Sequence, residues 1–272
     1  MPIPALVLDP LGLPALPDSL LDAAVGPLPL PAHAETAGAT YEADSCGEAR
    51  LYPAPCQAPP YPAMTLDSGD GLVQAFVFNV YASQVCGTFG HSAAEAERRV
   101  RARFQVAEAR AVERAFWGAV AGTDGIDDVV GQIGQVSLAA SANTIEAVSL
   151  LEQQMATVYG GQAIIHARPR MAAYMAKNYL VEPGANPPMT AAGNRVVFGR
   201  GYGGIGPANE AVGATTEYMF ATGRVIIWRN DLWVSPPDQL LDRSLNQRGL
   251  YAIRTYAIAV ECGAASTLVT RG

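Results

Sequence analysis

The longest regular pattern of apolar and polar positions lies between Ser92 and Gly122. Ser92 and Glu95 have the spacing of a helix-capping box, and strong helix formers follow them. Apolar residues recur three and four positions apart and form a stripe: Val100, Phe104, Ala107 and Ala111, then Val112, Phe116 and Val120. The pattern predicts one amphipathic helix over residues 93–121, roughly 40 Å long at about 1.5 Å per residue.

Shorter patterns on the C-terminal side predict a mixture of helices and strands. Helical spacing returns in residues 144–159, and a third helix is expected to begin at Pro169, because proline is tolerated in the first turn. Apolar runs predict buried strands at 162–167 and 194–199. Residues 72–81, which are rich in β-branched and aromatic side chains, predict a further strand before the long helix.

The last fifty residues are dominated by strand patterns. Residues 223–237 predict a β-hairpin that turns about Asn230 and Asp231. Residues 249–262 predict one long terminal strand. Strands and helices in this order predict an α+β fold.

Proline sets the first quarter of the chain apart, since 13 of the 20 prolines fall between Pro2 and Pro62. Each proline fixes φ and removes a backbone donor, so we expect neither regular helix nor central strand there. The segment also holds many leucines, valines and alanines, and its first basic residue is Arg50. We therefore predict an extended arm that buries its apolar side chains on another surface, which hints at assembly.

The composition narrows the class of protein. Of the 272 residues, 50% are hydrophobic and 16% charged, as in a folded protein. The net charge of -7 argues against a dedicated nucleic-acid binder. The N-terminus has no basic region of a signal peptide and no apolar run is long enough to span a bilayer, so we expect a soluble protein made in the cytosol. The four cysteines, which lack zinc-site spacing, are expected to be free and mostly buried thiols: Cys46, Cys56, Cys86 and Cys262.

A glycine-rich stretch after the strand at 194–199 matches the G-x-G-x-x-G pattern of dinucleotide-binding loops. Such a loop needs a helix N-terminus directly after it, and here Gly206 and Pro207 follow instead. We therefore expect no cofactor. The stretch predicts a tight, mobile loop that presents Arg200 and Tyr202 outward to a partner. Its residues are Gly199, Arg200, Gly201, Tyr202, Gly203 and Gly204.

Candidate catalytic and metal-binding residues are few. His166 lies on or just after a buried strand, without a nucleophile or carboxylate motif beside it, which favours a hydrogen-bonded structural role over that of a catalytic base. His33 and His91 have no ligand-spaced neighbours. Three acidic residues do not match a calcium loop and are expected at a solvated helix start: Asp124, Asp127 and Asp128. We expect no enzymatic activity and no metal.

Arginines of the long helix form a further candidate surface: Arg98, Arg99, Arg101 and Arg103, with Arg110 and Arg114. Glu95 and Glu97 precede Arg99 and Arg101 by four residues, the favourable order for ion pairs on a helix. The interleaved glutamates cancel most of the basic charge. A solvated or intersubunit face is therefore favoured over sequence-specific nucleic-acid recognition.

The order of these elements, arm, strand region, long helix and mixed body, resembles the major capsid proteins of tailed bacteriophages, the Hong Kong 97 fold. The sequences "YGGQAIIHARPRMAAYMAKNYLV", "GNRVVFGRGYGGIGP", "TEYMFATGRVII" and "YAIRTYAIAVECGAASTLV" are similar to those of short capsid proteins from actinobacteriophages. The resemblance covers residues 92–269. The fold it implies has an N-arm, an extended β-loop, a long spine helix, and peripheral and axial domains.

The resemblance also implies a division of the chain. The expected regions are an N-terminal arm at 1–45, the extended loop and strand region at 46–91, the spine helix with the first part of the peripheral domain at 92–143, the axial domain at 144–220, and the second part of the peripheral domain at 221–272. The glycine loop would then lie near a five- or six-fold axis, and the spine-helix arginines would contribute to assembly. Lys177, the only lysine, falls outside the extended loop, which argues against lysine-based crosslinking.

The function implied is that of a structural protein of the virion, assembled in the host cytoplasm. The chain would self-assemble through pentamers and hexamers into an icosahedral head shell around double-stranded DNA. Its expected partners are other copies of itself, packaged DNA contacted without sequence preference, the portal, and scaffolding or decoration proteins, with no membrane. Two structural alternatives stay open: an encapsulin-like compartment shell, or another virion subunit of the tail or connector. A third rival is a soluble hydrolase, for which the sequence shows no nucleophile–base pair.

Overall fold

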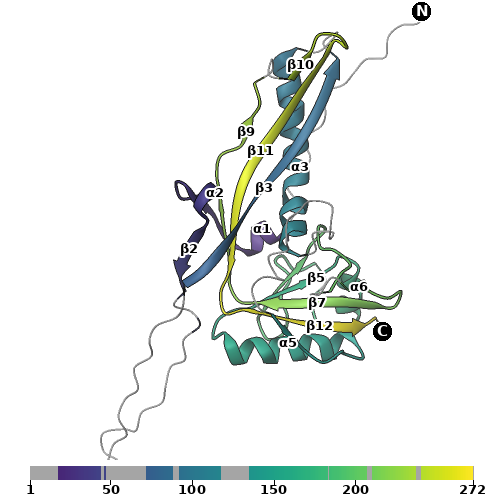
Figure 1. The fold of residues 1–272 in the computed structure, drawn as a ribbon. Helices are drawn as coiled ribbons and strands as arrows, with labels where there is room; N and C mark the ends of the chain where they lie inside the picture. The colour runs from purple at the N-terminus through teal and green to yellow at the C-terminus, as the bar shows by residue number, and fades with distance from the viewer. Residues whose placement is uncertain are drawn as a thin grey trace, which may run out of the picture.

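A computed structural model describes residues 18–43, 46, 72–87, 92–117, 135–182, 184–206, 210–236 and 240–271. Two sheets meet at an angle in it (Figure 1). The larger sheet forms an elongated body together with the longest helix, and the smaller sheet lies across one end of this body. None of the helices in the described part of the chain is long and apolar enough to cross a membrane.

The longest helix, α3, spans Ala93–Phe116. Its predicted start is confirmed, because the Ser92 side chain accepts a hydrogen bond from the Glu95 amide at 3.1 Å. The predicted end at residue 121 is wrong: the backbone turns to an extended conformation at Trp117. Val100 and Phe104 are buried as expected, whereas Ala107 is exposed, and Val112 and Phe116 continue the buried stripe.

The larger sheet is built on an antiparallel ribbon of two long strands, β3 (Leu72–Gly87) and β11 (Gln247–Val260). Their register runs from Gln247 opposite Gly87 to Ile258 opposite Phe76. Helix α3 covers one face of this ribbon (Figure 1). The shorter strands of the sheet are β1 (Val25–Pro29), β2 (Ala39–Glu42), β8 (Val225–Arg229), β9 (Trp233–Val234) and β10 (Leu240–Asp242).

The predicted hairpin about Asn230 and Asp231 is wrong. Strands β8 and β9 do not pair with each other but follow one another along the same edge of β11. Asn230 bridges the gap, since its side-chain oxygen accepts the Thr255 amide at 2.8 Å and its own amide donates to the Thr255 carbonyl. The observed hairpin joins β10 to β11, with Asp242 opposite Gln247.

The smaller sheet has the strand order β4-β12-β7-β5-β6. Its strands are β4 (Val136–Ser137), β12 (Ala264–Thr270), β7 (Thr216–Thr222), β5 (Ile164–Ala167) and β6 (Arg195–Phe198). The strands predicted at 162–167 and 194–199 are confirmed. Strand β11 is not the terminal strand as predicted, because a turn at residues 261–263 leads into β12.

Two helices accompany the smaller sheet, α5 (Thr144–Val158) and α6 (Met171–Lys177). Both confirm sequence predictions, and α5 lies along β12 and β7 (Figure 1). The Asn143 side chain caps α5 by accepting the Glu146 amide at 3.0 Å. Because β12 joins β7, the predicted ranges 144–220 and 221–272 share one sheet.

The described part of the N-terminal arm lies on the larger sheet. Strand β1 pairs in parallel with β8 and forms an edge of the sheet. Proline is tolerated in an edge strand, because the side without a backbone N–H can face solvent. The arm also contains two single-turn helices that were not predicted, α1 (Leu20–Ala23) and α2 (Ala34–Ala37). Leu20 is completely buried in the main core of its own subunit, so this part of the arm does not need a second surface to cover it, contrary to the expectation.

The molecule has two principal apolar cores. The larger core lies between α3 and the ribbon and extends to the smaller sheet; its largest fully buried side chains are Trp117, Tyr256, Phe104, Phe116, Phe220 and Leu20. The second core fills the space around α5, α6 and the smaller sheet, with Leu151, Met155, Ile165, Met171, Met175 and Met219. The hydrophobic patterns of the predicted helices and strands supply both cores.

The cysteines differ from the sequence-based expectation of free thiols. Cys46 and Cys262 form a disulfide bond, although 216 residues separate them in the sequence. Cys86 is free and buried, as expected. Cys56 lies outside the described residues. The pairing joins segments distant in the chain, so spacing alone could not reveal it.

Candidate functional site

The glycine-rich stretch lies against the C-terminal end of α3. A Cβ atom added to Gly201 would lie 2.1 Å from the carbonyl oxygen of Arg110 on that helix, so only glycine allows this close approach. The Gly201 amide donates to the Glu113 carboxylate at 2.9 Å, and the Gly203 amide donates to the Trp117 carbonyl at 3.1 Å. The glycines therefore join the smaller sheet to the helix.

Tyr202 does not point outward as predicted, since its side chain is only 4% exposed. Its ring lies 4.8 Å from that of Trp117, between centroids, and its hydroxyl meets Nδ1 of His166 at 2.8 Å. Arg200, by contrast, is exposed as predicted. An outward role for this loop therefore belongs to Arg200, and its place near a symmetry axis stays a prediction.

His166 is completely buried beneath the glycine stretch. Both ring nitrogens have partners, Nδ1 with the Tyr202 hydroxyl and Nε2 with the Thr222 hydroxyl at 2.9 Å. Burial lowers the pKa of His166 to about 3, so the ring is neutral near pH 7. Because no ring nitrogen is left to accept a proton from a substrate, the structure fits the predicted structural role.

Glu113 is a buried carboxylate that sequence analysis missed. One of its oxygens accepts the Leu20 amide at 3.1 Å, and the other accepts the Gly201 amide at 2.9 Å. Burial raises the pKa of Glu113, while the backbone donors and the nearby Arg200 partly offset that increase. This one side chain links the arm, α3 and the glycine stretch. The available signal was an acidic residue directly beside Val112 in the apolar stripe.

A second carboxylate, Glu108, fastens the middle of α3 to the ribbon. One of its oxygens interacts with the guanidinium groups of Arg229, at 3.1 Å, and of Arg254, and accepts the Tyr256 hydroxyl. Burial, followed by the hydrogen bond to Glu108, raises the pKa of Tyr256. The predicted apolar stripe is interrupted here. Ala107, which belongs to that stripe, is exposed, and the next residue, Glu108, contacts the ribbon instead.

The spine-helix arginines take part mainly in local contacts. Arg99 pairs with Glu95 at 2.6 Å and Arg101 pairs with Glu97 at 2.8 Å, which confirms both predicted pairs. Arg103 donates to the Ser83 carbonyl of β3 at 2.8 Å. Arg98 is exposed. A role of these arginines in assembly stays a prediction.

The face of the ribbon that points away from α3 carries exposed apolar side chains. On β3, Tyr81 is 69% exposed and Val85 is 64% exposed, while Trp233 of β9 is 47% exposed. Tyr81 lies opposite Ile253, which in turn lies opposite Trp233, so the three share one row across the sheet. The Trp233 ring also packs against Tyr251, with centroids 5.7 Å apart. We call these five residues the ribbon face.

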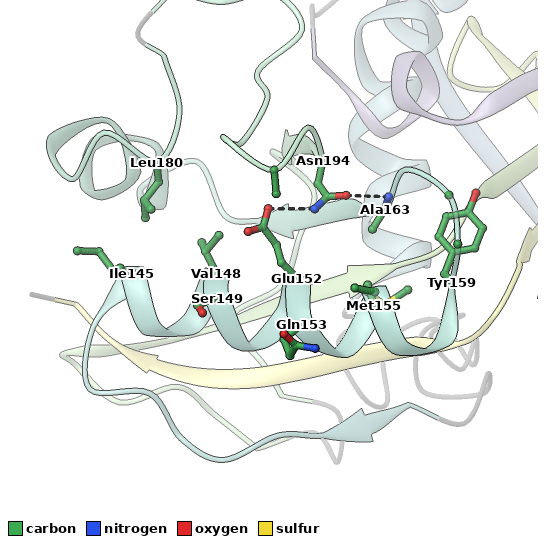
Figure 2. A pocket seen from close by; sticks show the side chains of 14 residues that line it. Ile145, Val148, Ser149, Glu152, Gln153, Met155, Tyr159, Ala163, Leu180 and Asn194 are labelled. Atoms are coloured by element: carbon green, nitrogen blue, oxygen red, sulfur yellow. Dashed lines mark hydrogen bonds between the residues drawn. The ribbon is translucent and has the colours of Figure 1, made fainter.

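A pocket of about 580 Å³ opens beside α5 (Figure 2). Figure 2 shows Glu152 pointing from the helix toward Asn194, whose amide nitrogen donates to that carboxylate at 2.9 Å. The same carboxylate accepts the Thr190 hydroxyl, and the Asn194 oxygen accepts the Ala163 amide. The two bonds to Glu152 hold α5 to the turn at residues 190–194, which leads into β6.

The remaining candidate residues do not form a site in the described chain. No group of three or more histidine, cysteine or acidic side chains there could hold a metal ion. Arg168 and Arg170 pair with the buried Glu217 beside α6. His91, Asp124, Asp127 and Asp128 lie outside the described residues.

Known protein families and curated protein sequences give no match to this chain. Solved structures do. The capsid of an empty GTA particle superposes with a TM-score of 0.63 at 15% identity, covering 99% of this chain and 95% of that one. The capsid of a native GTA particle superposes with a TM-score of 0.59 at 15% identity, covering 96% of this chain and 98% of that one. A structure from Mycobacterium phage Cain superposes with a TM-score of 0.57 at 12% identity, covering 99% of this chain and 95% of that one.

The chain has a phage capsid fold. The similarity extends over nearly the whole length of both chains in each pair, so it includes the arm, the ribbon with α3 and the smaller sheet. The predicted fold class, α+β of the Hong Kong 97 type, is confirmed.

Proposed function

We propose that this chain is the major capsid protein of a tailed phage, a structural subunit without enzymatic activity that assembles into an icosahedral head shell. The observation that carries the proposal is the near-complete overlap, in both directions, with the capsids of GTA particles. A subunit that shares its whole fold with shell proteins presents its surfaces to other copies of itself. The virion head is then its location, and assembly takes place in the host cytoplasm.

The ribbon face is a surface on which a second copy would pack. Soluble monomers rarely leave large aromatic side chains together on an exposed sheet face, and here Tyr81, Tyr251 and Trp233 share one. Tyrosine and tryptophan also supply much of the free energy of association in protein interfaces. The shell would therefore derive part of its stability from covering the ribbon face.

The five regions named from the sequence, 1–45, 46–91, 92–143, 144–220 and 221–272, are proposed as arm, extended loop, spine, axial and peripheral regions. Arg200 would face neighbours about a five- or six-fold axis, in pentamers and hexamers. Exposed arginines such as Arg98 would contact packaged DNA without sequence preference. The portal, with scaffolding or decoration proteins, completes the proposed set of partners.

The two alternative functions have less support. An encapsulin-like compartment shell and a tail or connector subunit remain distinct hypotheses, but the structural similarity is to capsids of particles. A tail or connector subunit would form open rings or tubes, whereas a capsid subunit forms closed shells. Closure of the assembly separates a capsid subunit from a tail or connector subunit. Neighbouring genes for a portal and a terminase, in place of a gene for an encapsulated enzyme, separate a capsid subunit from a compartment shell.

Assembly by the ribbon face can be tested with the double variant Tyr81→Ser and Trp233→Ser. Both side chains are exposed, so the fold should persist, and sedimentation velocity should show loss of large particles in favour of small species. Val106→Ser removes an exposed apolar side chain of α3 and serves as the matched control, which should still assemble. Unchanged assembly of the double variant, with an unchanged circular dichroism spectrum, would exclude the ribbon face as a subunit contact.

A further inference from the structure

The disulfide Cys46–Cys262 connects the residue directly after the N-terminal arm to the turn between the two sheets. Cys46 follows strand β2 of the arm, and Cys262 lies in the turn from β11 of the larger sheet to β12 of the smaller one. The two Cα atoms are 5.2 Å apart. The bond therefore fixes the arm at the point where the chain passes between the two bodies.

Contacts other than the disulfide hold the same two segments together. Tyr41 of β2 packs on Trp228 of β8, with ring centroids 5.7 Å apart. Strand β2 is also paired with β3 along its length. On the other side, two hydrogen bonds of 2.8 Å and 2.6 Å tie Glu261, the residue before Cys262, to Arg224. These contacts do not involve sulfur, so they would hold strand β2 and Glu261 in the same places whether the two cysteines are thiols or a disulfide.

Both sulfur-bearing residues are accessible to small oxidants and reductants. Cys46 and Cys262 are each half-buried, whereas Cys86 is buried in the ribbon. Thiol–disulfide exchange requires a path for the attacking thiolate to reach sulfur. Within the described residues, this pair is therefore suited to change its oxidation state in the folded protein, and Cys86 is not.

We propose that Cys46 and Cys262 form a redox-responsive clasp, which is open as two thiols while the subunit is assembled and closed as a disulfide after the particle leaves the cell. The timing rests on the proposed function, because a reducing cytoplasm keeps thiols reduced and the extracellular medium does not. While the clasp is open, only side-chain packing and strand pairing hold the arm. Once it is closed, the arm is covalently fixed in the assembled shell.

The chemistry of closure needs an oxidant such as a small-molecule disulfide. The thiolate of one cysteine attacks a sulfur of the oxidant, which releases one thiol and leaves a mixed disulfide on the protein. The second cysteine then attacks the protein-bound sulfur, which forms the Cys46–Cys262 bond and releases the second thiol. The two cysteines together lose two electrons and two protons, and the oxidant gains them.

The proposal is tested by trapping thiols at two stages with an alkylating agent. Protein expressed in a reducing bacterial cytosol is quenched in acid inside the cells, and a second sample is purified and treated with glutathione disulfide. Peptide mass spectrometry should find both cysteines alkylated in the cells, and linked within one chain after oxidation. Dithiothreitol should lower the melting temperature of the oxidised protein by at least about 5 °C.

Variants assign this effect to the clasp. Dithiothreitol should not change the melting temperature of Cys46→Ser or Cys262→Ser, whereas Cys56→Ser and Cys86→Ser should respond like the wild type. Disulfide already present in the quenched cells, thiols that persist after oxidation, or linkage between chains would each overturn the proposal. The assay reads single chains, so it still gives an answer if no shell forms and the proposed function fails.

Discussion

Gly201 illustrates how one residue without a side chain positions two bodies of the molecule. Its Cα lies so close to α3 that an added Cβ would overlap the Arg110 carbonyl oxygen, and its amide is a donor to Glu113. The sequence indicated that this stretch of glycines was special, but it did not indicate why. The contact joins residues far apart in the chain, so local patterns favoured an outward loop.

Gly201→Ala should lower the free energy of unfolding by about 2–4 kcal/mol, because the backbone must move away from α3 and the Gly201–Glu113 hydrogen bond is lost. Urea unfolding of unassembled protein measures the change. Gly160→Ala is the matched control, because an added Cβ there meets nothing within 4 Å. Equal stability of the two variants would show that the close approach to α3 does not hold the loop.

Glu113 predicts a specific dependence of stability on pH. Its pKa in the folded protein is raised by burial, so the folded state binds the proton more tightly than the unfolded chain does. The contribution of Glu113 to the free energy of unfolding is fully present below its pKa in the unfolded chain, and it is lost as the pH rises through its pKa in the folded protein. From about pH 4 to about pH 8, the wild type should therefore lose stability relative to Glu113→Gln. Urea unfolding at both pH values measures this, and a difference independent of pH would contradict the buried ionisable state.

At the scale of elements, sequence patterns located helices and strands better than they paired them. The start of α3 was predictable because capping is local, and so was α5. The end of α3 at Phe116 was not, because Trp117 leaves the helix to pack on Tyr202 and Phe220. The prediction of a hairpin about Asn230 was wrong for a related reason. Strands β8 and β9 both pair with β11, a partner that the local turn signal does not specify.

Helix α3 should depend on Glu108 for its attachment to the ribbon. Glu108→Ala leaves Arg229, Arg254 and the Tyr256 hydroxyl without their shared acceptor. We expect a loss of about 2–3 kcal/mol in the free energy of unfolding, less than for a fully buried pair, because the Arg229 side chain is 35% exposed.

The matched control for this change is Glu97→Ala on the same helix. It removes the pair with Arg101, in which both side chains are more than two-fifths exposed, and should cost less than about 1 kcal/mol. Thermal or urea unfolding of the two variants gives the comparison. Similar losses for both would mean that the Glu108 cluster adds no more than a surface ion pair.

At the scale of the whole molecule, the order of elements predicted the fold class, while the contacts between distant segments had to be observed. The Cys46–Cys262 bond, the carboxylates Glu108 and Glu113 and the ribbon face each depend on such contacts. Tyr81, at the end of the predicted strand, and Val85, beyond that end, are exposed apolar side chains, although a sheet face in contact with water usually carries polar ones. That departure from the usual pattern is what an assembling subunit requires.

Electron microscopy of the purified protein, expressed alone and then together with the neighbouring genes, tests the central claim most directly. We expect closed shells tens of nanometres across, or free pentamers and hexamers, in which neighbouring copies cover the ribbon face. A monodisperse monomer or dimer under both conditions would contradict the account, as would open rings or tubes.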